Sequence, residues 1–451
     1  MMFNLEEILV ATNAKVIKNE LNYENSDNVR FNISTDTRKI SGGEIYLPLK
    51  GENFNGEDFL DKAIENGAVG CFVTGDKYPQ SAKLVLKVEN TLCAYLAIAN
   101  FRRNKINPIT VAITGSSGKT TTKELVYSVM SQKFKTHKTF SNHNNEIGFC
   151  ETVMTMPDDC EVLIVEMGMR GLGEIELLSK YSEPDFGIIT NAGSAHIGRL
   201  GSLDNIAKAK SEIVSHLKPN GALISQNNER IKKFADFDGE KIFYELSDAE
   251  IICQGKSYTK FIYKNREYEL NIEGNFNVEN SIAAIEVGYK AGMNYEQVKQ
   301  GLANYKPIEK RWEVETAGGF NFINDSYNAN PDSMKASVST FIDLYDNPVV
   351  ILGDMGELGS FTDNLHRSVG EFLGTNPKVL KAFFLTVGEY SPQITTPLKE
   401  IGCQVQNFET TLDVAKFVIN NIDKNSTIFL KASRSMKFEK IIEYIKGEVR
   451  Q

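Results

Sequence analysis

The sequence predicts an α/β protein of three domains: a small N-terminal α/β domain, a central P-loop ATPase-type parallel sheet and a C-terminal Rossmann-like domain. Three observations lead to this fold class. The 451 residues correspond to about three domains at roughly 150 residues each. Short apolar runs alternate with stretches of helical periodicity, as in doubly wound sheets. A glycine-rich turn joins one such strand to a helix. We place the domains at residues 1–106, 107–309 and 310–451.

The composition is that of an ordinary globular chain. Hydrophobic residues make up 41% and charged residues 24%, which excludes disordered, collagen-like and coiled-coil proteins. The net charge of −9 argues against whole-molecule attraction to nucleic acid or to an anionic membrane. A local basic pocket for an anionic small molecule is compatible with this charge.

The location expected from the sequence is the cytoplasm. Six scattered cysteines without a CxxC pair indicate reduced thiols. The first residues lack a basic segment followed by an apolar run, so we expect no signal peptide. No stretch of about 18 consecutive apolar residues occurs, so we expect no integral membrane association. We further expect a monomer.

The first domain should contain short strands at 44–49, 68–73 and 83–88. A helix is predicted within the segment 58–68 and should end at Gly67. The apolar face of this helix consists of Phe59, Leu60, Ala63 and Ile64. The polar segment 101–108 is interpreted as a linker to the second domain, because it ends in a proline.

The central domain should open with a buried strand at 109–114, a tight loop and a helix over 123–134. Buried strands are also predicted at 161–166 and 185–190, because parallel strands covered on both faces are apolar throughout. The alternating pattern of 251–273 predicts a small antiparallel excursion. The buried stripe of the helix should consist of Leu125, Val126, Val129, Met130 and Phe134.

The third domain should be another doubly wound sheet. Four strands are predicted at 320–325, 347–354, 381–388 and 426–432, separated by helices. The helix that follows the first of them should have Asn330 as N-cap and Pro331 as its first residue. Its apolar stripe consists of Met334, Val338, Phe341, Ile342 and Tyr345.

The loop after the first central strand has a phosphate-binding pattern. Glycines let backbone N–H groups approach a polyphosphate, and the helix N-terminus adds its positive dipole end. Lys119 can reach the β- and γ-phosphates, and Thr120 can hold Mg²⁺. Ile113 stands where the standard GxxxxGKS/T pattern has its first glycine, so an incidental turn is the alternative interpretation. The residues expected to bind nucleotide are Gly115, Ser116, Ser117, Gly118, Lys119, Thr120 and Thr121.

An acidic residue marks the same edge of the sheet. Glu166 ends an apolar strand, where ligands bind in sheets of this kind. It is either a solvated strand-end acid or a magnesium ligand. A phosphate loop alone does not separate an ATPase from a GTPase, a kinase or a ligase.

These residues resemble the Mur ligases, the ATP-dependent amide ligases of peptidoglycan synthesis. The resemblance rests on TGSSGKTT, on VEMG around Glu166 and on the stretch 190–213. It implies two Mg²⁺ ions held by Thr120, Glu166, His196 and Lys210. Lys210 stands where the family carries a lysine carbamylated by CO₂, and Lys208 is the alternative position. Carbamylation replaces an ammonium by an anionic oxygen ligand, which suits a hard cation.

The resemblance extends to the nucleotide-binding residues of two domains. GNFNVENSIAA resembles a motif whose asparagines contact adenine, which implies this role for Asn277 and Asn280, although Phe276 replaces the usual histidine. Arg311 matches an arginine that approaches the γ-phosphate, and Asp325 matches an acid that bonds the ribose. Outside the family context, Asn280 would equally be a turn residue and Arg311 a solvated side chain.

Other runs indicate a branch of the family. SYNANPDSM, GDMGELG and LHRSVG with His366 resemble the branch that adds D-alanyl-D-alanine to UDP-N-acetylmuramoyl-tripeptide. SNHNNEIG resembles a run of the same branch, which implies muramoyl-peptide contacts at Asn144 and Asn145. The substrate residues implied in the third domain are Tyr327, Asn328 and Asn330.

The first domain carries a further part of the resemblance. STDTRKISGGEIYLPLKGENFNGEDF is similar to the uridine-nucleotide domain of the family. This similarity implies that the UDP part of the substrate is bound by Ser34, Asp36 and Arg38. The chain departs from the pattern at Asn55, where the family has aspartate, and at Glu57, where histidine is common.

The resemblance implies a reaction in two steps. ATP would phosphorylate the tripeptide carboxylate to an acyl phosphate, and the dipeptide amine would then displace phosphate. The catalytic residues would be Lys119, Lys210 and Arg311, which bring or hold charge near the transferring phosphoryl group. Two alternatives stay open: a related ligase that adds a single amino acid, such as another Mur enzyme or a folate polyglutamylating enzyme, and a non-catalytic nucleotide-binding protein.

Overall fold

The computed structural model describes residues 3–21, 29–51, 53–308 and 310–448. The chain forms two compact units, and each is described by itself. The first unit comprises Met1–Thr110, His137–Val165 and Lys180–Glu183. The second comprises Val111–Thr136, Glu166–Ser179 and Pro184–Gln451, so it holds the phosphate loop together with the whole C-terminal sheet.

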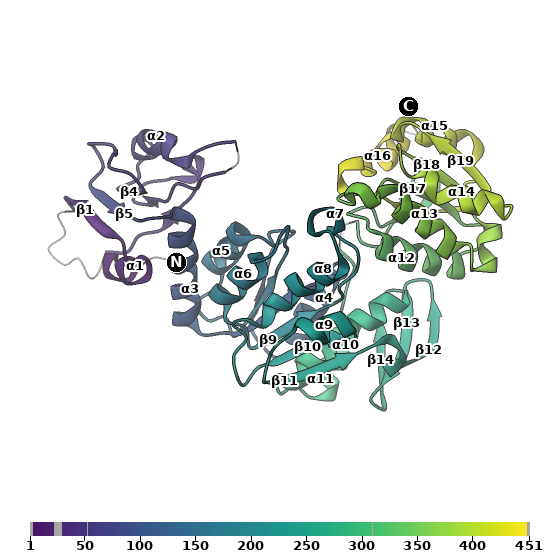
Figure 1. The fold of residues 1–451 in the computed structure, drawn as a ribbon, viewed down its shortest axis with the longest axis horizontal. Coiled ribbons are helices and arrows are strands. Elements are labelled where there is room, and N and C mark those ends of the chain that lie inside the picture. Colours follow the sequence, from purple (N-terminus) through teal and green to yellow (C-terminus); the bar gives the residue numbers. More distant parts are fainter. Residues whose placement is uncertain (1–2, 22–28, 52, 309, 449–451) are drawn as a thin grey trace. The chain divides into compact units, whose positions relative to one another are not determined.

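The N-terminal sheet has the strand order β1-β5-β4-β3-β2, in which β1 is antiparallel and the other pairs are parallel (Figure 1). Its strands are β1 (Lys15–Asn19), β2 (Ile33–Ser34), β3 (Ile45–Tyr46), β4 (Gly70–Val73) and β5 (Leu84–Lys87). Its helices are α1 (Leu5–Thr12), α2 (Leu60–Glu65) and α3 (Thr91–Ile106). The three predicted strands are therefore present, and β3 is shorter than expected.

The predicted helix at 58–68 is present only in part. A 3₁₀ turn, η3 (Gly56–Phe59), precedes α2, which begins at Leu60. Phe59 is 46% exposed and does not belong to the buried face, whereas Leu60 and Ala63 are buried. The prediction for Phe59 was wrong because its backbone belongs to the preceding turn, which points the ring away from the core.

The interpretation of 101–108 as a linker was wrong. Residues 101–106 form the last turns of α3, and Asn107 ends the helix in the left-handed conformation. Arg102 and Arg103 are both buried. Arg102 donates to the Val153 carbonyl at 3.0 Å, and its guanidinium lies 2.9 Å from the Asp158 carboxylate. These partners lie some fifty residues away in sequence, so the local polarity of the segment could not reveal them.

The central sheet has the order β11-β10-β9-β6-β8-β7, and β6, β9, β10 and β11 pair in parallel. The strands are β6 (Ile109–Thr114), β7 (Thr136–Lys138), β8 (Val162–Glu166), β9 (Phe186–Ile189), β10 (Ala222–Gln226) and β11 (Glu240–Tyr244). The helices are α4 (Lys119–Met130), α5 (Glu146–Thr155), α6 (Glu174–Ser182), α7 (Ile197–Leu200), α8 (Leu203–Ser211), α9 (Glu229–Phe234), α10 (Asn275–Lys290) and α11 (Tyr295–Ala303).

The helix after the phosphate loop begins earlier than predicted and also ends earlier. α4 starts directly behind the loop at Lys119, and Phe134 lies beyond its end. The other four residues of the predicted stripe are buried, and α10 and α11 pack against α4. The predicted antiparallel excursion is confirmed by a sheet of β12 (Ala249–Gly255), β13 (Tyr258–Tyr263) and β14 (Arg266–Leu270).

The C-terminal sheet has the order β15-β16-β20-β17-β18-β19, parallel except for β15. Its strands are β15 (Glu313–Ala317), β16 (Phe320–Asn324), β17 (Val349–Gly353), β18 (Phe383–Val387), β19 (Gln404–Phe408) and β20 (Thr427–Lys431). Its helices are α12 (Pro331–Leu344), α13 (Thr362–Leu373), α14 (Pro392–Glu400), α15 (Thr411–Asn421) and α16 (Glu439–Glu448). The four predicted strands are confirmed.

The start of α12 is also as predicted. Asn330 caps the helix with its side chain, and Pro331 is its first residue. All five residues of the predicted stripe are buried. No helix in the described part of the chain is both long and apolar enough to span a bilayer.

Candidate active site

The phosphate loop requires its two glycines. Gly115 and Gly118 have φ angles of +156° and +77°, and Gly118 precedes the first residue of α4. A Cβ on Gly115 would lie 1.8 Å from Thr190 Oγ1, and one on Gly118 would lie 2.6 Å from Asn280 Oδ1. A side chain at either position would be strained, so the loop backbone depends on both glycines.

Asn191 holds the loop from the neighbouring strand end. Its Oδ1 accepts hydrogen bonds from the backbone N–H groups of Ser116 and Ser117, both at 3.0 Å. Its Nδ2 donates to Ser117 Oγ at 2.9 Å. Sequence analysis did not assign a role to Asn191, because an asparagine in a glycine-containing loop gives no signal of its own.

Several charged groups act on the Lys119 side chain. Its Nζ donates to the Gly115 carbonyl at 2.7 Å. Burial lowers the pKa of Lys119, and the Arg311 cation lowers it further. The carboxylates of Glu166 and Glu357 act in the opposite direction and raise it. The charges of Glu166, Glu357 and Arg311 therefore all act on Lys119.

The Arg311 guanidinium stacks on an aromatic ring. Its centre lies 4.1 Å from the centroid of Tyr327. Arg311 Nε is buried and has no hydrogen-bond partner among the residues that the structure describes. A buried guanidinium donor beside a phosphate loop is suited to an anionic ligand.

Glu166 ends β8 and is only 2% exposed. Lys123, one helical turn beyond Lys119, places its Nζ 3.5 Å from Glu166 Oε2. Thr120 is buried in the first turn of α4. The sequence pattern predicts no role for Lys123, because only the folded chain brings it close to Glu166.

The two candidate lysines of α8 have different environments. Lys210 is 1% exposed, whereas Lys208 is exposed. Burial, and then the Lys119 cation, holds the pKa of Lys210 well below its usual value. The neutral amine is the form that reacts with CO₂ and a lowered pKa favours that form, so these surroundings favour Lys210 over Lys208.

His196 immediately precedes α7 and has a left-handed backbone, with a φ of +65°. Its Nδ1 lies 2.5 Å from Glu357 Oε2. Two residues upstream, Ser194 donates to Asp332 from its backbone N at 2.8 Å and from its hydroxyl at 3.1 Å. Sequence analysis did not assign contacts to Glu357 or Asp332, although both stand in the two runs that indicated the branch.

The donor set fits Mg²⁺. Thr120 supplies a hydroxyl, Glu166 a carboxylate and His196 an imidazole, and Mg²⁺ commonly completes its shell with substrate phosphates and water. In the described ranges no group of three or more His, Cys, Asp or Glu side chains forms a metal cluster. The hydroxyl and the carboxylate are oxygen donors of the kind that Mg²⁺ takes beside nucleotide phosphates.

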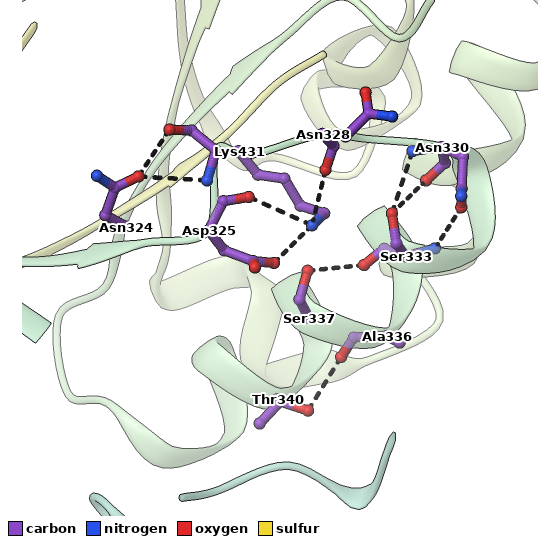
Figure 2. Close-up of polar contacts among 10 residues, drawn as sticks. Asn324, Asp325, Asn328, Asn330, Ser333, Ala336, Ser337, Thr340 and Lys431 are labelled. Carbon is purple, nitrogen blue, oxygen red and sulfur yellow. Dashed lines mark hydrogen bonds and ion pairs between the residues drawn. The ribbon is translucent and has the colours of Figure 1, made fainter. Parts of the chain in front are cut away.

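Among the residues predicted to contact adenine and ribose, Asn280 lies against the phosphate loop. It lies against Gly118, because its Oδ1 would be 2.6 Å from a Cβ added to that glycine. Asn277 is buried, and its Nδ2 donates to the Glu273 carbonyl at 2.6 Å. Lys431 Nζ lies 2.5 Å from Asp325 Oδ2 (Figure 2).

Phe276 belongs to an aromatic cluster. Its ring centroid lies 5.8 Å from that of Trp312, which in turn lies 5.5 Å from that of Phe429. The position where the family usually has histidine is therefore an apolar packing position in this chain.

The predicted substrate residues of the third domain directly precede α12. Asn330 uses its Oδ1 to cap Ser333 N at 2.9 Å (Figure 2) and its Nδ2 to reach the Ser116 carbonyl at 3.2 Å. Tyr327 is partly buried under Arg311, and Asn328 is exposed. The run NANPDSM therefore contacts the phosphate loop directly.

The predicted substrate residues of the first unit form two local groups. Arg38 makes a two-point contact with Asp36, at 2.9 and 2.8 Å, and this pairing lowers the pKa of Asp36 to about 2. Ser34 Oγ donates to the Asp36 carbonyl at 3.0 Å. Asn145 caps α5 by accepting from Gly148 N at 3.0 Å, and Asn144 precedes it in the chain.

Glu57, which departs from the family pattern, has a structural contact. Its Oε1 accepts from the backbone N and the hydroxyl of Thr74, at 2.7 and 2.8 Å. The carboxylate therefore fastens η3 to the end of β4.

This fold and loop define a class: an α/β protein with a P-loop nucleotide site at the edge of a parallel sheet and a second, Rossmann-like sheet in contact with that loop. Comparisons with known proteins narrow the class. Residues 113–288 match the model of the Mur ligase middle domain, and residues 310–434 match that of the Mur ligase glutamate ligase domain. The chain belongs to the Mur ligase family.

Full-length relatives agree with the domain matches. The UDP-N-acetylmuramoyl-tripeptide--D-alanyl-D-alanine ligase of Bacillus subtilis (strain 168) is 35% identical, covering 95% of this chain and 96% of that protein. The ligase of the same name from Escherichia coli (strain K12) is 30% identical, covering 91% and 92%. The crystal structure of MurF from Acinetobacter baumannii aligns with a TM-score of 0.88 at 25% identity, covering 99% of both chains.

A further solved structure shares the fold. MurF ligase from Thermotoga maritima in complex with ADP aligns with a TM-score of 0.82 at 23% identity, covering 93% of this chain and 97% of that chain. The predicted three-domain Mur ligase fold is therefore confirmed.

Proposed function

We propose that this chain is the ATP-dependent ligase that joins D-alanyl-D-alanine to UDP-N-acetylmuramoyl-tripeptide, with release of ADP and phosphate. One observation carries the proposal. The branch-specific run NANPDSM contacts the phosphate loop, because Asn330 Nδ2 donates to the Ser116 carbonyl at 3.2 Å. The product is the UDP-N-acetylmuramoyl-pentapeptide, a peptidoglycan precursor.

In the first step an oxygen of the tripeptide carboxylate attacks the γ-phosphorus of ATP. The bond between that phosphorus and the β–γ bridging oxygen breaks, and ADP leaves with the oxygen. Lys119 and Arg311 neutralise the charge that develops on the phosphoryl oxygens. The backbone N–H groups of the loop hold the nucleotide phosphates in line for transfer.

In the second step the dipeptide amine attacks the acyl carbon. A C–N bond forms, the C–O bond to phosphate breaks, and inorganic phosphate leaves. The amine gives up a proton as the amide forms. Exclusion of water from the site protects the acyl phosphate from hydrolysis until the dipeptide binds.

Two Mg²⁺ ions are proposed as cofactors, held by Thr120, Glu166, His196 and carbamylated Lys210 together with nucleotide phosphates. When bound, these ions neutralise the phosphoryl oxygens and hold them in one orientation. The Lys210 carbamate forms when the neutral amine attacks CO₂ and releases a proton, which leaves an anionic oxygen ligand. Burial beside Lys119 supports this proposal for Lys210 in preference to Lys208.

The remaining residue assignments are part of the same proposal. Asn277 and Asn280 contact the adenine, and Asp325 binds the ribose. The UDP group is bound by Ser34, Asp36 and Arg38. Asn144 and Asn145 bind the muramoyl-peptide, and Tyr327, Asn328 and Asn330 are the substrate residues of the third domain. The domain boundaries given above, a monomeric state and a cytoplasmic location stay predictions; unpaired thiols at all six cysteines are compatible with a reducing compartment.

The test is phosphate release from ATP and Mg²⁺, measured with and without UDP-N-acetylmuramoyl-tripeptide and D-alanyl-D-alanine. Release should require both acceptors. Lys119→Ala should reduce turnover by about 10²–10³-fold or more, as loss of a transition-state charge partner does, with an unchanged far-ultraviolet circular dichroism spectrum. Lys133→Ala, just beyond α4, is the matched control. Unchanged turnover in Lys119→Ala would contradict the site.

A further inference from the structure

The run GDMGELG forms a braced arm on the C-terminal sheet. At its base, the Asp354 carboxylate accepts hydrogen bonds from the backbone N–H groups of Glu389, Tyr390 and Ser391, at 3.0, 3.0 and 2.7 Å. His366 is buried, and its Nε2 accepts from Met355 N at 2.9 Å. The base of the arm is therefore fixed on two sides.

Glu357 stands at the tip of this arm in a left-handed backbone conformation, with a φ of +62°. Such a conformation is unfavourable for a residue with a side chain and is kept where the surroundings require it. Here it turns the carboxylate toward the segment that carries His196. Glu357 Oε2 lies 2.5 Å from His196 Nδ1, and Oε1 lies 3.6 Å from Arg199 Nε.

The backbone fixes the same approach. Gly198 N donates to the Glu357 carbonyl at 3.1 Å. A Cβ on Gly198 would lie 2.5 Å from Gly359 N, and one on Gly359 would lie 3.0 Å from Gly198 Cα. α7 and η6 (Gly359–Phe361) thus pack backbone to backbone, which leaves the Glu357 side chain little freedom to move away from His196.

We propose that Glu357 is a positioning residue for His196, an inference that rests on the proposed function. Its carboxylate, 2.5 Å from His196 Nδ1, holds a proton on that nitrogen and so fixes the imidazole as the tautomer with an unprotonated Nε2. That nitrogen is then the one that presents its lone pair to Mg²⁺. A carboxylate on the far nitrogen of a metal-binding histidine orients the ring and raises its basicity.

The contact also joins two domains of the chain. His196 lies within the residues that match the middle domain, and Glu357 lies within those that match the C-terminal one. The metal ligand is therefore oriented only while the C-terminal arm is docked. The run GDMGELG therefore positions a residue of the metal site, in addition to being a signature of the branch.

The experiment compares Glu357→Ala and Glu357→Gln with the unchanged full-length chain. The first readout is ¹⁵N NMR of the imidazole nitrogens in metal-free protein, with His196→Gln used to assign the His196 signals. We expect a protonated Nδ1 and an unprotonated Nε2 in the unchanged chain, and a mixture of both tautomers in Glu357→Ala. Glu357→Gln keeps an oxygen acceptor and should preserve the original tautomer.

The second readout is Mn²⁺ binding in the presence of ADP, followed by electron paramagnetic resonance. The affinity of the site that contains His196 should fall about 10–100-fold in Glu357→Ala and less in Glu357→Gln. Glu400→Gln, an exposed carboxylate on α14, is the control and should change neither readout. Thermal unfolding identifies any variant that fails to fold. If Glu357→Ala fails to fold, the Mn²⁺ affinity of Glu357→Gln decides, and an unchanged affinity would overturn the proposal.

An unchanged tautomer and unchanged Mn²⁺ affinity in Glu357→Ala would overturn the proposal. Both readouts are independent of the acceptor substrates. A shifted tautomer in a chain that fails to ligate D-alanyl-D-alanine would therefore reject the proposed function and retain the role of Glu357. An active ligase whose tautomer is unshifted in Glu357→Ala would reject the role of Glu357 and retain the proposed function.

Discussion

Lys431 Nζ lies 2.5 Å from Asp325 Oδ2, so the carboxylate expected to bond the ribose is ion-paired with the end of β20 (Figure 2). Lys431 also reaches the Asp325 and Asn328 carbonyls, at 3.4 and 3.5 Å. Both side chains of the ion pair are largely buried. Lys431 therefore fixes Asp325 and the chain that follows it in one position.

Replacing Lys431 should weaken ATP binding more than it slows chemistry. Lys431→Ala leaves the Asp325 carboxylate without its cation, which should raise the KM for ATP about tenfold and lower the free energy of unfolding by roughly 2–4 kcal/mol. Steady-state kinetics and urea unfolding measure the two effects. Lys440→Ala, an exposed lysine on α16, should change neither, and an unchanged KM in Lys431→Ala would remove Lys431 from the nucleotide site.

Replacing Asn191 should loosen the phosphate loop. Asn191→Ala removes an acceptor for two backbone N–H groups, each bond contributing about 0.5–1.5 kcal/mol, and should raise the Kd for ADP about tenfold. Isothermal titration calorimetry measures this Kd. Asn191→Asp should bind ADP still more weakly, because it adds a negative charge beside the phosphates. Tighter binding in Asn191→Ala would mean that the side chain competes with the phosphate instead of supporting the loop.

The two lysines of α8 provide a matched pair for the carbamate. Lys210→Ala should abolish turnover, and an added short-chain carboxylic acid should restore part of it by supplying the missing carboxylate oxygen. Lys208→Ala should retain turnover, since that side chain is exposed. If activity is lost in Lys208→Ala and kept in Lys210→Ala, the assignment of the modified lysine is reversed.

The arm that carries Glu357 should weaken in acid. Burial lowers the pKa of His366 in the folded chain, whereas the unfolded chain retains the usual value near 6.5. The unfolded state therefore binds more protons below about pH 6.5, and stability falls as the pH decreases through that range. Urea unfolding between pH 7.5 and 5.5 measures this, and His366→Gln should have a smaller dependence. An equal dependence in both proteins would assign the effect to other groups.

The sequence predicted those features that depend on local pattern. The apolar strands, the phosphate loop and the start of α12 at Asn330 are each determined by neighbouring residues, and the structure has them as expected. The buried Arg102 was missed because its partners, Val153 and Asp158, come from a distant segment. Local polarity alone predicted a linker there.

The contacts of the site were the least predictable part. His196 and Glu357 are 161 residues apart in sequence (357 − 196), and nothing near either residue indicates the other. The family resemblance indicated individual ligands and left their partners unspecified. Pairs such as Asn191 with the loop and Lys431 with Asp325 appear only when the folded chain brings separate strand ends together.

The most direct test of the account is the mass of the product formed from UDP-N-acetylmuramoyl-tripeptide, ATP and Mg²⁺ in the presence of D-alanyl-D-alanine or D-alanine alone. The account predicts that the substrate gains the dipeptide less one water, with one phosphate released for each product formed, and that D-alanine alone gives no product. Addition of a single amino acid, or phosphate release without any gain in mass, would contradict the account.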